Sequence, residues 1–219
     1  KGNVVIDLNI PYITGAEGYV FHNGHCVIHN NKRDKFGLID KKGNWMLKAE
    51  YDAISPKDSF FVVSKGGMQS VLTENLKPIL PFMEADLWIS GNSITATMKD
   101  HTLRKYNLQG ELIDDFLIRN VDRLLYDTDE IRYTTAKNYD DEGNLTGETA
   151  EAEPTPYQKT ANCKKYEADI GWYGLMSPSG KVITPPRYCD ITAIGYDLYL
   201  CKTDDIRGEV LNGKGVRVK

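Results

Sequence analysis

A turn motif recurs along the chain at nearly constant intervals, and this recurrence limits the fold more than any other feature. The turn positions are Gly2, Gly43, Leu76, Gly110, Gly180 and Gly215, separated by 41, 33, 34, 70 and 35 residues. Self-similarity with a period of 20–50 residues is typical of solenoids, propellers and other repeat arrays. One interval is double the others, and its excess lies between residues 136 and 168.

Two copies of the unit are clear. Residues 37–54 (GLIDKKGNWMLKAEYDAI) align with residues 174–191 (GLMSPSGKVITPPRYCDI) at a shift of 137. Both glycines, the tyrosine and the final isoleucine coincide. Weaker copies appear at shifts of 33 and 67, with Leu76 in place of one turn glycine. Residues 1–6 match the second part of a unit, and residues 210–215 match the first part.

Each unit predicts short β-strands around a tight turn. Apolar residues alternate at Phe36 and Leu38 and again at Trp45 and Leu47, as half-buried strands require. The Lys-Lys-Gly-Asn segment between them supplies a residue that tolerates positive φ. A third strand follows in segments such as 60–63 and 198–201. No window longer than about ten residues has a helical stripe, so we predict an all-β fold.

The unit resembles the bacterial WG repeat, also called the KWG repeat. The resemblance rests on Trp172-Tyr173-Gly174 through Ile191 and on Phe36-Gly37 through Ile54, and it covers most of the chain outside residues 136–168. It implies an all-β repeat protein, usually bacterial and often exported, that mostly lacks an assigned activity. The repeat motif contains no catalytic residue, so the resemblance transfers none.

The chain ends favour a closed ring. The chain begins and stops partway through a unit, and strands at 4–6 and 216–218 could pair to complete a composite blade. We therefore predict one domain over residues 1–219, a small β-propeller of about five blades closed by its N- and C-terminal strands. An open twisted β-solenoid is the alternative, because 33–35 residues is short for a blade.

The segment at about 136–168 breaks the array and is predicted to be an inserted loop or hairpin. It is rich in Glu, Thr and Pro, a composition that buries little surface. Its Asn138-Tyr139-Asp140-Asp141-Glu142-Gly143 stretch resembles the start of a calcium-binding loop, with glycine at position 6, but position 12 is Thr149 instead of glutamate. A hairpin that turns at 141–144 explains the same residues. Long loops on rigid scaffolds often contact ligands.

A histidine-rich stretch is the candidate metal site. Asn23-Gly24 predicts a two-residue hairpin turn that sets His22 opposite His25. Cys26 should point away from His25, and His29 lies roughly 13 Å along the strand at about 3.3 Å per residue. The four side chains therefore cannot meet on one tetrahedral ion. A polar hairpin tip is the competing interpretation.

Aromatic residues and cysteines supply the remaining candidates. Trp172, Tyr173, Tyr157 and Tyr139 are candidate binding residues in or beside the inserted segment, since exposed aromatic faces can stack on sugars or protein partners. Cys189 and Cys201 fall on neighbouring predicted strands and form the expected disulfide if the compartment is oxidising. Small buried hydrophobic side chains are the alternative for all four cysteines.

These observations favour a non-catalytic interaction module that presents a β-scaffold to a protein partner. A carbohydrate-binding module using surface Tyr and Trp is the first alternative, and an enzyme with an unrecognised site is the second. No catalytic or cofactor-binding motif is present, and we predict no cofactor. The net charge of −4 gives no reason to expect nucleic acid, and no apolar run could span a bilayer. We expect an exported bacterial protein, periplasmic or on the cell surface, with its signal sequence removed.

Overall fold

The computed structural model describes residues 20–30, 32, 34–132, 135–150 and 154–219. Every regular element in these ranges is a β-strand, and the chain forms two compact units. The N-terminal unit comprises residues 1–99 and 103–117, and the C-terminal unit comprises residues 100–102 and 118–219. The predicted all-β repeat class is confirmed. Within the described residues there is no helix of the length and hydropathy needed to span a membrane.

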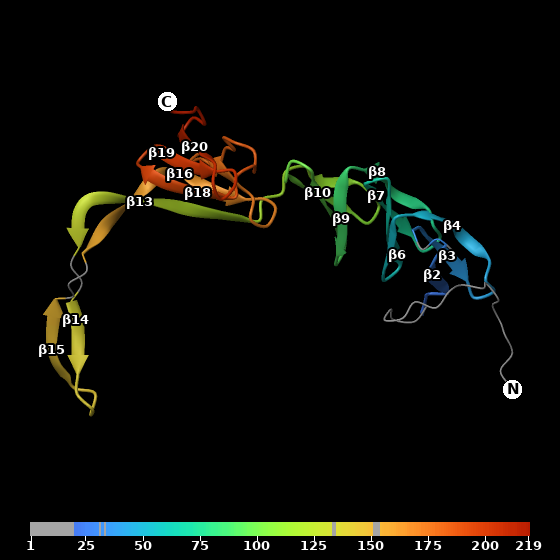
Figure 1. Cartoon of the computed structure of the whole chain (residues 1–219), viewed down its shortest axis with the longest axis horizontal. Helices are drawn as coiled ribbons and strands as arrows, with labels where there is room; N and C mark the ends of the chain where they lie inside the picture. Colours follow the sequence, from blue (N-terminus) through green and yellow to red (C-terminus); the bar gives the residue numbers. More distant parts are fainter. Residues whose placement is uncertain (1–19, 31, 33, 133–134, 151–153) are drawn as a thin grey trace. The chain divides into compact units, whose positions relative to one another are not determined.

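The described part of the N-terminal unit contains three antiparallel sheets of four strands each (Figure 1). Each sheet is a meander in which consecutive strands are hydrogen-bonded neighbours. The strands are β1 (Phe21–His22), β2 (His25–His29), β3 (Phe36–Asp40) and β4 (Trp45–Tyr51); β5 (Ala53–Lys57), β6 (Phe60–Lys65), β7 (Met68–Thr73) and β8 (Pro78–Met83); and β9 (Ala85–Ser90), β10 (Ser93–Met98), β11 (Leu103–Asn107) and β12 (Leu112–Asp114).

The C-terminal unit contains two three-stranded sheets and one separate two-stranded hairpin (Figure 1). One sheet has the order β13-β16-β17, another the order β18-β19-β20, and β14 pairs with β15. Their bounds are β13 (Asn120–Arg132), β14 (Thr135–Tyr139), β15 (Leu145–Ala150), β16 (Thr155–Glu167), β17 (Tyr173–Met176), β18 (Asp190–Gly195), β19 (Leu198–Lys202) and β20 (Gly208–Asn212).

The hydrophobic cores lie between consecutive sheets. In the N-terminal unit, Leu38 of β3 packs with Phe61 and Val63 of β6, and Val71 of β7 packs with Ile94 of β10. In the C-terminal unit, a single cluster joins side chains of β13, β16 and β17 to those of β18, β19 and β20. Within each unit, the clusters thus join neighbouring sheets, as in stacked repeats.

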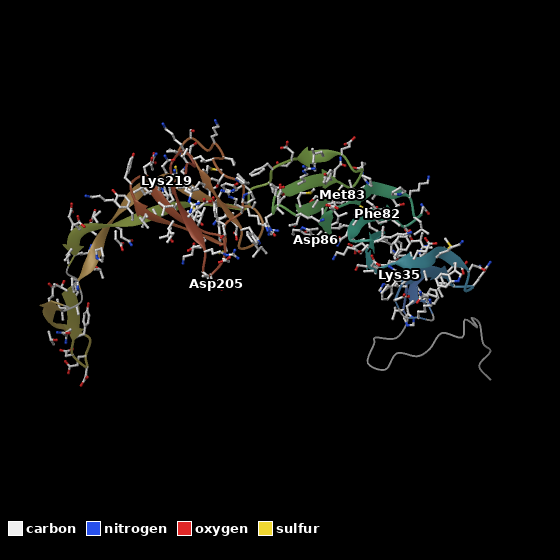
Figure 2. The ribbon with its side chains drawn as sticks, turned by 45° about the horizontal axis from the view of Figure 1, so that its top comes forward. Lys35, Phe82, Met83, Asp86, Asp205 and Lys219 are labelled. Carbon is white, nitrogen blue, oxygen red and sulfur yellow. The ribbon has the colours of Figure 1, made fainter. Side chains whose placement is uncertain are left out.

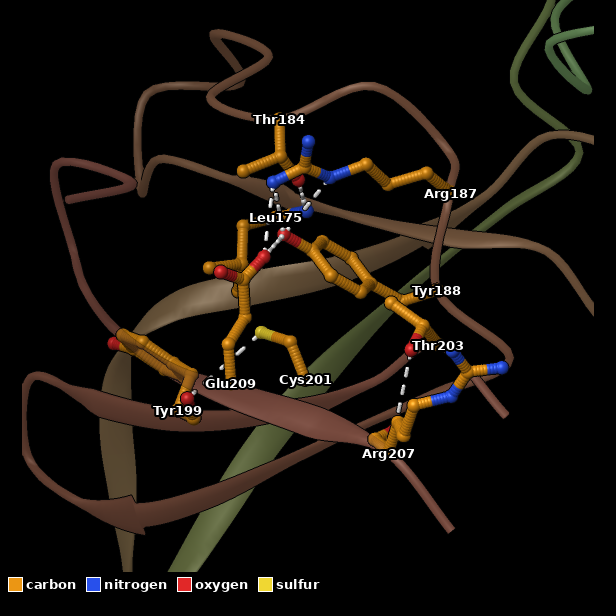
Figure 3. Close-up of polar contacts among 9 residues, drawn as sticks. All are labelled: Leu175, Thr184, Arg187, Tyr188, Tyr199, Cys201, Thr203, Arg207 and Glu209. Carbon is orange, nitrogen blue, oxygen red and sulfur yellow. Dashed lines mark hydrogen bonds and ion pairs between the residues drawn. The ribbon is translucent and has the colours of Figure 1, made fainter. Parts of the chain in front are cut away.

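A polar network surrounds the hydroxyl of Tyr188, a residue of the C-terminal core (Figure 3). Tyr188 is fully buried, and its hydroxyl donates to Glu209 Oε1 over 2.8 Å. Arg187 Nη2 donates both to the Tyr188 hydroxyl (2.7 Å) and to Glu209 Oε1 (3.0 Å). Burial raises the pKa of Tyr188 to about 12. Because every partner is paired, the hydroxyl is buried without an unsatisfied polar atom.

One turn geometry recurs six times in the described residues. In each case the N–H of the fourth residue donates to the carbonyl of the first, and the fourth residue has positive φ. The hydrogen bonds are Gly43→Asp40, Leu76→Thr73, Gly110→Asn107, Gly143→Asp140, Gly180→Ser177 and Gly215→Asn212. Leu76, with φ of 62°, adopts the conformation that glycine supplies elsewhere. Gly2, the remaining expected turn position, lies outside the described residues.

The turn at Gly143 shows that the inserted segment keeps the period of the array. It divides the double interval of 70 residues into 33 and 37. The pairing around the turn is also the same as elsewhere: Tyr139 pairs with Leu145 as Ile39 pairs with Trp45 and Leu72 with Pro78. Residues 136–168 therefore contain a hairpin that has the register of the repeat.

This hairpin differs from the other units in the residue directly before the turn. The equivalent side chain is buried in all five other described units, as Ile39, Leu72, Tyr106, Met176 and Leu211. In the hairpin this residue is Tyr139, which is 61% exposed. The hairpin therefore lacks the buried apolar contact that the other units make at this position. The turn chemistry is thus retained while the packing is lost.

Ring closure remains a prediction. The N-terminal strand expected at residues 4–6 lies outside the described residues. At the other end, Arg217 bridges to Leu211 and the Val218 N–H donates to the Val210 carbonyl (2.8 Å), so the last residues pair with β20 of their own sheet. None of the described sheets closes on itself.

Candidate functional site

The candidate site lies on a two-stranded ribbon made by β13 and β16. The first part of β13 belongs to the sheet with β16 and β17, while residues 125–132 pair only with residues 155–160 of β16. In the regular units a tight turn separates the first strand of a sheet from the second, as at Gly91, with φ of 55°, between β9 and β10. The position 33 residues later is Leu124, which is followed by a second leucine. No turn forms at this position, and β13 continues through it with a register shift between Arg123 and Leu125.

A concave site opens where the ribbon is irregular. The register shifts between Asp127 and Ile131, where β13 has more residues than the facing part of β16. Such a bulge bends the strand and re-aims its side chains. The resulting hollow has a volume of about 370 Å³ and is lined by Asp127, Arg132, Thr155, Pro156 and Gln158.

The side chains around this hollow are held by direct contacts. Gln158 Nε2 donates to Asp127 Oδ1 over 2.9 Å, and Thr128 Oγ1 donates to the Tyr157 carbonyl over 2.7 Å. The Arg132 guanidinium lies 5.2 Å from the centre of the Tyr157 ring. Asp127 is the single carboxylate that lines this hollow. The arrangement offers hydrogen-bond donors and acceptors to a ligand, and the enzyme alternative stays a prediction.

Two of the sequence candidates, Tyr157 and Tyr139, lie on the ribbon and the hairpin. Tyr157 is 40% exposed, with Arg132 over its ring. Tyr139 is 61% exposed and stands opposite Leu145, which is 54% exposed. The β14–β15 hairpin therefore carries an apolar pair next to its turn with no core residue beneath it.

The other two candidates, Trp172 and Tyr173, have occupied faces. Trp172 is half-buried and stacks on the His101 ring, with centroids 3.6 Å apart and an interplanar angle of 10°. His101 Nδ1 lies 3.6 Å from Asp169 Oδ2. Lys165 Nζ lies 4.6 Å above the Tyr173 ring, and burial raises the pKa of Tyr173, with nearby Glu167 and Asp190 adding to the effect. Neither ring offers an open face on that side to a ligand.

The histidine hairpin forms as its sequence predicts, with Asn23 and Gly24 at φ of 48° and 85° and His22 opposite His25. The Nδ1 atom of His25 is buried without a hydrogen-bond partner, and its ring packs edge-on against Phe61 at 5.5 Å. Among the residues that the structure describes, no three His, Cys, Asp or Glu side chains are placed to hold a metal ion. A metal shared by His22 and His25 stays a prediction.

The calcium-like loop is a capped turn. Asp140 Oδ1 accepts from the N–H groups of Glu142 (3.0 Å) and Asn144 (2.7 Å), and these bonds lower the pKa of its carboxyl group. Asp40 in the first clear repeat makes the same bonds: its Oδ1 accepts from the N–H groups of Lys42 and Asn44. The carboxylate at the third position of the loop is thus engaged by the backbone.

The predicted Cys189–Cys201 disulfide is not formed, because all four cysteines are free thiols. Cys201 is fully buried and pairs across the sheet with Ile191, two residues beyond Cys189. The Cys189 thiol points to the Lys202 carbonyl at 3.4 Å. The register of β18 and β19 thus directs the two sulfur atoms to different neighbours.

The comparison with known families decides the kind of repeat. The family described as "WG containing repeat" matches residues 36–68 and 173–205. The chain contains WG repeats. These two segments are the two clear copies of the unit, and they include β3 with its turn in the N-terminal unit and β17 with its turn in the C-terminal unit. No curated protein matches the WG-repeat chain in sequence.

Several solved structures are similar at low identity. The computationally designed Ika8 protein has 15% identity and a TM-score of 0.31, over 91% of this chain and 71% of its own. Hsv2p of Kluyveromyces lactis has 10% identity and a TM-score of 0.32, over 87% of this chain and 58% of its own. BamB from Moraxella catarrhalis has 9% identity and a TM-score of 0.30, over 91% and 56%. The WG-repeat chain thus spans less than two thirds of the last two, and similarity at this level says nothing about function.

Sequence reasoning missed the ribbon. It placed Tyr157 and Tyr139 as candidates, yet it gave no role to Asp127, Arg132 or Gln158. The usable signal was the absence of a turn residue at Leu124-Leu125, where the array expects one between two strands.

Proposed function

We propose that the protein is a non-catalytic interaction module that binds a protein partner through the ribbon and the β14–β15 hairpin. The observation that carries the proposal is the exposure of apolar side chains that lie outside the hydrophobic core clusters. Exposed fractions are 48% for Leu125, 57% for Ile131, 61% for Tyr139, 54% for Leu145 and 40% for Tyr157. Exposed apolar residues gathered on one element are typical of interaction sites.

The geometry of the ribbon supports a protein partner. In β13 the exposed Leu125 and Ile131 fall on the face that also carries Pro156, because paired residues share a face of the ribbon. Asp127 and Gln158 stand between them on the same face. Apolar side chains beside a few oriented polar groups are the usual composition of a protein-binding surface.

The experiment is a selection of random peptides by phage display on two forms of the full chain. One is the wild type, and the other has residues 136–149 replaced by Asn-Gly, which shortens the hairpin. Peptides that bind the wild type at micromolar concentration and lose at least about tenfold in affinity on the shortened form support the proposal. If no peptide distinguishes the two forms, the hairpin is not the binding element and the proposal fails.

A carbohydrate ligand is the second candidate, favoured by Trp45 and Trp88, which are 45% and 44% exposed on β4 and β9 of the N-terminal unit. Flat aromatic faces suit sugar rings. Phe82, labelled in Figure 2, is also 39% exposed. Its ring stacks on Tyr51, with ring centroids 6.5 Å apart. A glycan array separates the two candidates, since binding that is lost in Trp88→Ala and retained in the shortened hairpin would favour sugar.

We also propose that the protein is exported by a bacterium, as the WG-repeat resemblance implies. Fractionation of cells that express the full-length gene tests this. Recovery of the protein in the cytosolic fraction alone would contradict export.

A further inference from the structure

The β14–β15 hairpin lacks the strand that covers the corresponding edge in every other described unit. The strand before each turn is β3, β7, β11, β17 or β20, and each is paired on both sides. For example, β3 lies between β2 and β4, and β7 lies between β6 and β8. By the shared register of the turn, β14 is their equivalent. Among the described residues, β14 pairs with β15 alone.

The missing strand is present in the sequence and has another partner. A shift of 100 carries Asp40 to Asp140, and it carries β2 (His25–His29) to residues 125–129. These residues lie in β13, where Leu125 and Asp127 pair with Thr160 and Gln158 of β16. The outer edge of β14 is therefore a vacant strand position of the repeat. An exposed edge of this kind can be completed by an added strand from another chain.

The backbone groups at this edge follow from the turn. The Asp140 N–H donates to the Asn144 carbonyl (3.0 Å), so Asp140 faces β15. Backbone groups of alternate residues in a strand point to opposite neighbours, which directs those of Tyr139, Lys137 and Thr135 to the outer edge. In β3 the equivalent Ile39 faces Cys26 of β2. An incoming strand would therefore meet the backbone of Lys137 and the side chain of Tyr139.

The negative charge of residues 127–159 indicates the chemistry of the partner. Residues 127–159 hold nine Asp and Glu against three Lys and Arg, a net charge of −6, whereas the whole chain carries −4. The other residues together are therefore slightly positive, at +2. Asp141, Glu142 and Glu148 of the turn and β15 are all exposed. This concentration of negative charge favours a basic partner and repels an acidic one.

We propose that the outer edge of β14 binds an extended, basic segment of a partner protein by strand addition, with alternate apolar side chains of that segment on the face of Tyr139 and Leu145. This inference rests on the proposed function and names its site and its partner class. Main-chain hydrogen bonds would supply affinity, and charge and the apolar pair would supply selectivity.

The test uses the full chain and synthetic peptides of about nine residues, long enough to span β14 at about 3.3 Å per residue. One peptide alternates Lys and Val, and its control alternates Glu and Val. Binding is measured by fluorescence anisotropy at low and high salt. We expect the basic peptide to bind and the acidic control not to bind. Salt should weaken this binding, because it screens the attraction between exposed charges.

Two protein variants separate strand addition from charge attraction. Lys137→Pro removes the outward N–H and should weaken binding about tenfold or more, while proline at an exposed edge leaves the β14–β15 pairing intact. Lys137→Ala keeps the N–H and removes a repelling cation, so it should bind as well as the wild type or better. A cross-strand nuclear Overhauser effect between Tyr139 and Leu145 reports that the hairpin is formed.

A modified peptide tests the same point with the unaltered protein. Methylation of the peptide nitrogens along one edge blocks strand addition on that edge, and methylation along the other edge leaves it free. Loss of binding for one methylated peptide and retention for the other supports the proposal. Equal binding of both, or unchanged binding of Lys137→Pro with an intact hairpin, overturns it.

The outcomes also separate this inference from the proposed function. If the basic peptide does not bind, yet phage display yields peptides that depend on the hairpin, strand addition is wrong and the interaction module stands. If neither experiment yields binding, both are wrong.

Discussion

At the scale of single residues, close packing explains the glycine of the WG motif. A Cβ atom on Gly174 would lie 2.5 Å from Tyr166 Cε1, and one on Gly37 would lie 2.6 Å from Trp45 Cζ3 and 2.8 Å from Ala49 N. Real Cβ atoms do not approach so closely, so either change must move an aromatic ring or the backbone. The sequence indicated where these glycines lie, and the structure gives the reason for them.

Gly174→Ala should therefore destabilise the C-terminal unit by about 1–3 kcal/mol, the usual cost of overpacking a core. Gly147→Ala is the matched control, because its Cβ would have open space and its φ is not positive. The control should change the free energy of unfolding by no more than about 0.5 kcal/mol. Urea denaturation followed by circular dichroism measures both, and equal effects would refute the packing argument.

Buried acids in the C-terminal core predict a loss of stability in alkali. Burial raises the pKa of Tyr188 from 10.0 to about 12 and that of Cys201 from 9.0 to about 12. Between these values the unfolded chain has released protons that the folded chain still binds, so the free energy of unfolding falls as the pH rises. Stability should be complete below about pH 9 and should decline up to about pH 12.

A pH series of urea midpoints checks this prediction. Cys201→Ala removes the contribution of this thiol and should make the decline shallower, while Cys163, Tyr188 and Tyr199, whose pKa values burial also raises, keep theirs. A wild-type stability that stays constant from about pH 9 to about pH 12 would show that these groups are not buried in their protonated forms.

At the scale of elements, the same turn supports two different outcomes. Around Gly43 it joins β3 and β4, which pack through Leu38, and around Gly143 it joins β14 and β15, which have no buried side chain among their described residues. Local hydrogen bonds are sufficient to form the turn, because Asp40 and Asp140 each accept from two backbone N–H groups. Packing on a neighbouring sheet needs a buried apolar side chain such as Leu38, and the described residues of the second hairpin include none.

Shortening the hairpin should consequently cost little stability. Replacing residues 136–149 by Asn-Gly, a favoured two-residue turn, should change the free energy of unfolding by less than about 1 kcal/mol. Leu175→Ala, which removes a fully buried side chain from the C-terminal core, should cost about 2–5 kcal/mol. Thermal unfolding compares the two. A large loss in the shortened form would mean that the hairpin contributes to the core.

At the scale of the whole molecule, the chain is an all-β array whose described sheets fall into two compact units, each with its own core. Repeat arrays gain stability mainly between neighbours, so damage in one unit need not spread to the other. We expect Leu175→Ala to speed hydrogen exchange in β17 and β19 and to leave β6 and β7 protected. Val71→Ala should do the reverse.

Hydrogen exchange with mass spectrometry measures protection strand by strand. Equal loss of protection in both units from either substitution would indicate one cooperative body and would contradict independent units.

The sequence by itself determined the turns and the strand class. Turn formation depends on a few adjacent residues: an Asp, Asn, Ser or Thr first and a residue tolerant of positive φ fourth. That is why Gly43, Gly110, Gly180 and Gly215 could be placed in advance, whereas Leu76 was placed by the period of the array. The all-β repeat class followed from these turns and the alternating strands between them.

Tertiary structure alone decided which strands pair beyond each turn. The residues next to Leu125 and Thr160 do not indicate that the two pair across 34 intervening residues, because long-range pairing depends on competition among all strands. The same competition leaves β14 with an open edge and sets Cys201 opposite Ile191 instead of Cys189. The turn residues give the period of the array, whereas packing decides which strands pair.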